Sequence, residues 1–87
     1  MSAKRKEKNK KSAINDLIEV MERLRAPDGC PWDREQDHKS IRFHAVEEVY
    51  ELIDAIEMDD DDEMLEECGD LLLQVVFHCQ LAKERNA

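Results

Sequence analysis

The stretch EEVYE, residues 47–51, decides how this chain is interpreted, and the stretch ECGD, residues 67–70, repeats its pattern. Each lies in an apolar run that predicts a helix. Residues three apart share one face of a helix, so Glu48 pairs with Glu51 and Glu67 with Asp70. If the two helices pack antiparallel, the four carboxylates converge, and they repel one another unless a cation joins them. We therefore expect a cation site between two helices.

The composition indicates an all-α protein. The chain has 87 residues, which is the size of one small domain. Hydrophobic residues make up 41%, enough for a globular core, while the 40% of charged residues suits helices with solvated faces. With only two glycines, two prolines and 5% aromatic residues, turns are few and strands are poorly supported.

The charge is unevenly distributed. Residues 1–11 hold six basic residues and one acidic one, so the remainder is even more acidic than the overall charge of −9. An acidic body repels nucleic acid backbones and anionic lipids, so neither is expected as a partner. We expect residues 1–11 to form a disordered basic tail and residues 12–87 to form a single helical domain.

The cysteines and the hydropathy both point to the cytoplasm. Cys30, Cys68 and Cys79 are an odd number and include no CxxC pair, which fits a reducing compartment better than a disulfide scaffold. No apolar run approaches the length needed to span a membrane, and the charged start lacks a hydrophobic signal core. We therefore expect a cytoplasmic protein without a membrane segment.

Three main helices are expected. The first runs from an N-cap at Ser12 to about Leu24 and is stopped by the stretch APDG, residues 26–29. The second runs from Ile41 to about Met58, with Asp37 or Ser40 as its cap. The acidic residues 59–62 should form the turn to the third, residues 63–85. Because that turn is short, the second and third helices should be antiparallel neighbours.

The second helix has two distinct faces. Its apolar residues recur at heptad-like spacing in one stripe: Val46, Val49, Ile53 and Ile56. The adjoining face carries His44, Glu48, Glu51, Leu52 and Ala55, so the acidic pair should border the core, with Glu47 and Asp54 further toward solvent.

The third helix is apolar around nearly its whole circumference. A helix of this kind needs neighbours on all sides, which three helices do not easily provide. Either a fourth helix is missing from this chain or a second subunit supplies it. We expect a three-helix antiparallel bundle that a second subunit completes into four-helix-bundle-like packing. Gly69 inside this helix suggests a close backbone approach.

The chemistry of the acidic pairs favours a hard cation. Carboxylate oxygens select magnesium, or manganese in its place, over zinc, and the cysteines and histidines are too scattered for a zinc site. Magnesium commonly bridges substrate phosphates, so the implied reaction is on a phosphate ester or anhydride. Trp32 is expected in a loop, either as a plug over the helical core or as a stacking surface for a ligand ring.

The two acidic stretches resemble the metal signature of the MazG-type nucleoside triphosphate pyrophosphohydrolases, which belong to an all-α superfamily. Two further stretches are similar to this family: CPWD at residues 30–33, with Gln36, and GDLLLQVVF at residues 69–77. The resemblance covers roughly residues 17–84.

The resemblance implies a site and a reaction. An NTP or dNTP would be hydrolysed between the α- and β-phosphates to an NMP and pyrophosphate, often as house-cleaning of non-standard nucleotides, by a homodimer or higher oligomer. The magnesium ligands would be Glu48, Glu51, Glu67 and Asp70. The catalytic carboxylates would be Glu47, Glu48 and Glu51, with Glu47 in a supporting role. Candidates for substrate binding are Trp32, Lys39, Arg42 and His44.

One alternative follows from where the chain departs from the family. The family's domain usually continues into further helical sequence, and few basic residues are available here to hold a triphosphate, among them Lys83 and Arg85. A truncated, catalytically weak module that binds nucleotide or metal, or that regulates through dimerisation, is therefore the second hypothesis.

Overall fold

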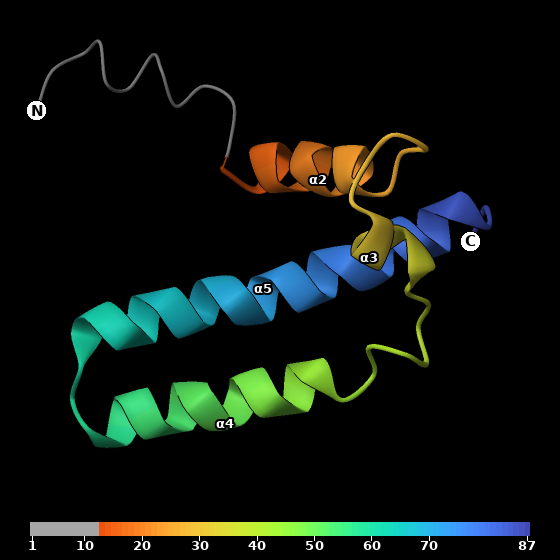
Figure 1. The fold of residues 1–87 in the computed structure, drawn as a ribbon. Coiled ribbons are helices and arrows are strands. Elements are labelled where there is room, and N and C mark those ends of the chain that lie inside the picture. The colour runs from red at the N-terminus through yellow and green to blue at the C-terminus, as the bar shows by residue number, and fades with distance from the viewer. Residues whose placement is uncertain (1–12) are drawn as a thin grey trace, which may run out of the picture. The chain divides into compact units, whose positions relative to one another are not determined.

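The computed structural model describes residues 13–87, and every regular element within them is helical. This part of the chain contains α2 (Ala13–Leu24), α3 (Pro31–Glu35), α4 (His44–Glu57) and α5 (Asp61–Glu84) (Figure 1). The all-α prediction is therefore confirmed. No helix in the described range is long and apolar enough to cross a membrane. The predicted basic tail and the predicted N-cap at Ser12 lie outside the described residues.

The chain groups into two compact units, one ending at Arg34 and the other running from Glu35 to Ala87. The first unit contains α2 and α3, and the second contains α4 and α5. The single domain expected over residues 12–87 stays a prediction.

In the first unit, a tight turn follows α2 and leads into α3. The Cys30 N–H donates to the Leu24 carbonyl at 2.9 Å and closes the turn. Glycine is required at position 29, because a Cβ there would collide with the backbone carbonyls at the end of α2. The expectation that Trp32 lies in a loop is wrong, since residues 31–35 form the short helix α3. Proline at the first position of a helix is favourable, because its fixed φ suits the first turn.

In the second unit, α4 and α5 form an antiparallel pair joined by a short acidic turn (Figure 1). Asp59 has a φ of 53°, in the left-handed region that aspartate tolerates better than most residues. The Asp60 carboxylate accepts a hydrogen bond from the Glu63 N–H at 3.1 Å and caps α5. The acidic turn predicted over residues 59–62 is therefore confirmed at residues 59–60, whereas Asp61 and Asp62 already belong to α5.

The start of α4 differs from the prediction. The helix begins at His44 rather than Ile41, and its N-cap is Phe43, which makes no side-chain capping bond. Asp37 and Ser40 do not cap it. They bond to each other instead: the Ser40 N–H donates to the Asp37 carboxylate at 2.7 Å, and the Asp37 N–H donates to the Ser40 hydroxyl at 2.8 Å. The two residues thus close a turn, and Ile41 after it is fully buried.

The face of α4 that packs inward is the one that carries acids. Ala55 is buried, and Leu52 and Glu48 are half-buried. The prediction that Glu48 borders the core is confirmed. The apolar stripe beside it is exposed within this chain, with exposed fractions of 40–49% at Val49, Ile53, Val46 and Ile56.

The helix α5 is likewise only partly covered. Glu67, Phe77 and Leu81 are buried, whereas Leu65 is 76% exposed and Val75 is 52% exposed. The neighbours that an all-round apolar helix needs are therefore not all supplied within the described chain. The close approach expected at Gly69 is not made within the described chain either, because no atom other than those of its chain neighbours and the surrounding helix backbone lies within 4 Å of the place its Cβ would take.

Candidate metal centre

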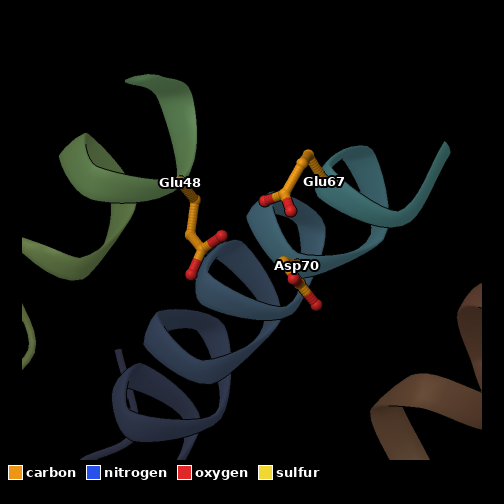
Figure 2. Close-up of side chains that lie close together, drawn as sticks. All are labelled: Glu48, Glu67 and Asp70. Carbon is orange, nitrogen blue, oxygen red and sulfur yellow. The ribbon is translucent and has the colours of Figure 1, made fainter. Parts of the chain in front are cut away.

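Three carboxylates from the two antiparallel helices meet at one point. Glu48 comes from the second turn of α4, and Glu67 and Asp70 come from one face of α5. One oxygen of each lies within 4.8 Å of the others. Figure 2 shows Glu48 reaching from α4 toward α5, with the carboxylate of Glu67 turned toward it. The structure therefore brings together three of the four carboxylates that the sequence selected.

Glu51 lies next to this group without joining the three. It is exposed, one turn after Glu48 on α4, and its side chain is hydrogen-bonded to Glu67. The hollow beside this bond has a volume of about 510 Å³ and receives carboxylates that sequence reasoning did not select: Asp54, Asp60 and Glu63. Glu63 lies one turn before Glu67 on the same face of α5, and this spacing in the sequence could have identified it.

Glu67 retains its proton into the neutral range. The hydrogen bond to Glu51, burial of the side chain and the negative charge of Glu51 raise its pKa from 4.5 to about 7. Burial and the charge of Glu51 also raise the pKa of Glu48. The cluster thus relieves part of its repulsion by holding a proton that Glu67 shares with its neighbours.

Two oxygens of this cluster have no hydrogen-bond partner. Glu48 Oε2 and Glu67 Oε2 are both buried and unpaired, and Glu67 as a whole is only 8% exposed. Buried polar atoms are almost always satisfied by protein, water or an ion, because an unpaired one costs about 1–3 kcal/mol. Carboxylate oxygens held in this way, with no nitrogen or sulfur ligand among them, match the donor set preferred by Mg²⁺.

The remaining predicted residues are not part of the carboxylate cluster. Glu47 is exposed on α4, and its supporting role stays a prediction. Lys39 is exposed, and the Arg42 guanidinium lies 5.0 Å from the centre of the Phe43 ring. His44, half-buried, opens α4 one turn before Glu48. Trp32 belongs to the unit that ends at Arg34 and is 52% exposed.

Residues 36–87 match the family model of the MazG nucleotide pyrophosphohydrolase domain. The chain belongs to this family. The matched range contains the whole α4–α5 pair and every carboxylate of the cluster. The resemblance inferred from the EEVYE and ECGD stretches is thereby confirmed.

Two relatives share half or more of the chain's residues over the matched range. The chain is 57% identical over 74 residues to a protein of Thermotoga maritima named nucleoside triphosphate pyrophosphohydrolase/pyrophosphatase MazG, and this match covers 85% of the chain. It is 50% identical over 72 residues, or 82% of the chain, to the nucleoside triphosphate pyrophosphohydrolase of Escherichia coli. The matches cover only 29% and 27% of those two proteins.

Proposed function

We propose that this MazG chain hydrolyses nucleoside triphosphates, NTP or dNTP, to the monophosphate and pyrophosphate in a Mg²⁺-dependent reaction. The observation that carries the proposal is the set of three carboxylates within 4.8 Å, on the helices that match the MazG domain. The activity named for the similar proteins of T. maritima and E. coli supports the same reaction. House-cleaning of non-standard nucleotides is the biological role we propose for it.

The cluster suits a divalent cation with oxygen ligands. Glu48, Glu67 and Asp70 would hold Mg²⁺, with Glu51 completing the set and Mn²⁺ as a substitute. The two unpaired buried oxygens would gain a partner, and the cation would take the place of the proton on Glu67. A bound Mg²⁺ supplies charge neutralisation at phosphate oxygens and lowers the pKa of a water ligand.

The chain's own residues then have separate tasks. Glu67 must release its proton, since a carboxylate binds a cation only when it is ionised. Glu47, exposed on the same helix as Glu48, would accept a proton from the attacking water. That water attacks the α-phosphorus in line, the bond from the α-phosphorus to the bridging oxygen breaks, and pyrophosphate leaves with the bond electrons.

The rival function is binding without turnover. The chain spans less than a third of the length of these two relatives, and the basic candidate Lys39 is exposed. A chain that holds the metal and the nucleotide without reacting would be a regulatory or dimerisation module. This reading predicts a calorimetric signal for nucleotide binding and no product after prolonged incubation.

Incubation of the folded chain with MgCl₂ and a panel of NTPs and dNTPs should release pyrophosphate and a nucleoside monophosphate. Product analysis by ion-exchange chromatography distinguishes this from loss of the terminal phosphate. Orthophosphate together with a nucleoside diphosphate as the first products would contradict the proposed reaction. EDTA should stop the release, and excess Mg²⁺ or Mn²⁺ should restore it.

We further infer that a second copy of the chain covers the exposed apolar residues. The stripe on α4 has a counterpart on α5 with alternating spacings of three and four residues: Leu65, Cys68, Leu72, Val75 and Cys79. The α4 stripe lies about a third of a turn from the inward face of its helix, and the α5 stripe lies nearly half a turn from the inward face of its own, in the same rotational sense. Because the helices are antiparallel, rotations of the same sense incline both stripes toward one side of the pair, where a second helical pair would complete a four-helix bundle.

Ile53→Glu should convert a dimer of this chain into monomers. A charge at the middle of the α4 stripe would be buried unpaired in the interface, which is strongly unfavourable. Light scattering coupled to size exclusion gives the mass. Phe43→Glu is the matched control, because Phe43 is 62% exposed and lies outside both stripes. A wild-type chain that is monomeric at high micromolar concentration would refute the interface.

A further inference from the structure

Two histidines join the segment before α4 to α5. His38 Nδ1 and His78 Nδ1 are 2.8 Å apart, the ring planes differ by 6°, and the ring centres are 5.0 Å apart. The centre-to-centre distance exceeds the nitrogen–nitrogen distance by nearly two ring radii. The rings therefore meet edge to edge in a common plane, and the two nitrogens point directly at each other.

A contact of this kind holds one proton. If neither Nδ1 carries hydrogen, two lone pairs face each other, and if both do, two N–H groups collide. A neutral pair therefore has one proton in the bridge and one on an Nε2. A pair with an additional proton must carry hydrogen on both Nε2 atoms, because the bridge is already full.

The surroundings of His38 decide between these states. Its Nε2 is buried and has no hydrogen-bond partner. A proton there would be a buried donor without an acceptor, which costs more than leaving the nitrogen bare. The neutral pair avoids this by placing its second proton on His78 Nε2, so that His38 donates from Nδ1. The charged pair has no such arrangement.

We propose that His38 and His78 form a neutral clip, bridged by one proton, that holds the segment before α4 against α5 and opens on acidification. The start of α4 depends on such contacts, because its N-cap Phe43 offers no side-chain bond. The Asp37–Ser40 turn and the fully buried Ile41 lie in the same segment. The clip needs no metal or nucleotide, so it stands apart from the proposed hydrolysis.

The charges of the neighbouring residues do not offset the cost of adding a proton to the neutral histidine pair. Asp37 and Lys39 flank His38 and are exposed, and so is Cys79 beside His78. Across the pair, the ionisable group that faces His78 is His38 itself. Burial, and then repulsion from His38, lowers the pKa of His78. Since the folded state binds this proton more weakly than the unfolded state does, stability is complete above the ordinary histidine pKa of ~6.5 and falls as the pH drops below it.

The first test is the tautomer of each ring in the wild-type chain at neutral pH. Two-bond ¹⁵N–¹H correlation spectra should show His38 protonated on Nδ1 and His78 protonated on Nε2. Titration should show His78 gaining its proton below pH ~6.5. Either a His38 proton on Nε2 or protonation of His78 at the ordinary value would overturn the proposal.

The second test compares melting temperatures at pH 7.5 and pH 5.5 in EDTA. In His38→Asn, the amide can donate to His78 Nδ1 or turn its oxygen toward a protonated ring, so it tolerates both states. Relative to this variant, the wild-type chain should lose an additional ~5 °C on acidification. Glu57→Gln, at an exposed position on α4, leaves the clip intact and should behave like wild type. An equal loss in wild type and His38→Asn would overturn the clip, even if the variant is less stable at both pH values.

Both proteins should carry Glu67→Gln in this comparison, because Glu67 titrates in the same range. The result does not depend on turnover. A failed nucleotide assay would leave the clip intact, and a missing clip would leave the proposed hydrolysis intact.

Discussion

Replacing Glu48 with glutamine should abolish pyrophosphate release and the rise in melting temperature that Mg²⁺ produces. Glu48 is the carboxylate that α4 contributes to the group of three, so its loss leaves ligands from α5 alone. Glutamine keeps the size of the side chain and removes its charge. We expect the rate to fall at least ~10²-fold, as it does when a group that stabilises charge in the transition state is removed.

The assay measures pyrophosphate at saturating nucleotide, with thermal melts with and without MgCl₂ alongside. Glu57→Gln is the matched control, since it makes the same change at an exposed position on α4. It should retain both the rate and the Mg²⁺-dependent stabilisation, which arises because a ligand that binds only the folded state favours that state. A Glu48→Gln chain with an undiminished rate would remove the carboxylate cluster from the mechanism.

The meeting of the acidic pairs was predictable from the sequence because it follows from two regularities. Residues three apart share a helix face, and helices joined by a short turn run antiparallel. These place Glu48 opposite Glu67 and Asp70 without any knowledge of side-chain detail. The position of Glu51, bonded to Glu67 but outside the group of three, depends on side-chain torsions that spacing does not determine.

The start of α4 was not predictable in the same way. Periodicity extends the helix back to Ile41, because that residue continues the inward face. In the structure, Asp37 and Ser40 use their side chains on each other, and the segment stays a turn up to Phe43. Local side-chain bonds of this kind compete with helix formation, and pattern counting does not register them.

The inward face of α4 shows a second limit of predicting structure from sequence periodicity. Its most regular apolar stripe is exposed, while the face with Glu48 packs against α5. Periodicity identifies a surface that must be covered, but it does not identify what covers it. An inward face that includes the half-buried Glu48 is unfavourable for stability alone, which points to a function for this acid.

Glutamine in place of Glu67 should remove a pH dependence of stability that the metal-free wild-type chain shows. The pKa of Glu67 is raised from 4.5 to about 7, so the folded state binds this proton more tightly than the unfolded state does. The stabilisation is complete below pH ~4.5 and is lost as the pH rises through ~7. Glutamine mimics the protonated acid at every pH, so the contribution of residue 67 to the free energy of unfolding should not change between pH ~4.5 and pH ~7.

Melting temperatures measured in EDTA from pH 5 to pH 8 test this. The advantage of Glu67→Gln over wild type should grow toward pH 8, whereas Glu66→Gln, an exposed neighbour on α5, should follow wild type. Added MgCl₂ should stabilise wild type more at pH 8 than at pH 5.5, because the cation competes with the proton for the same oxygens. It should leave Glu67→Gln nearly unaffected. Parallel pH curves for wild type and Glu67→Gln would show that the proton is not held at this residue.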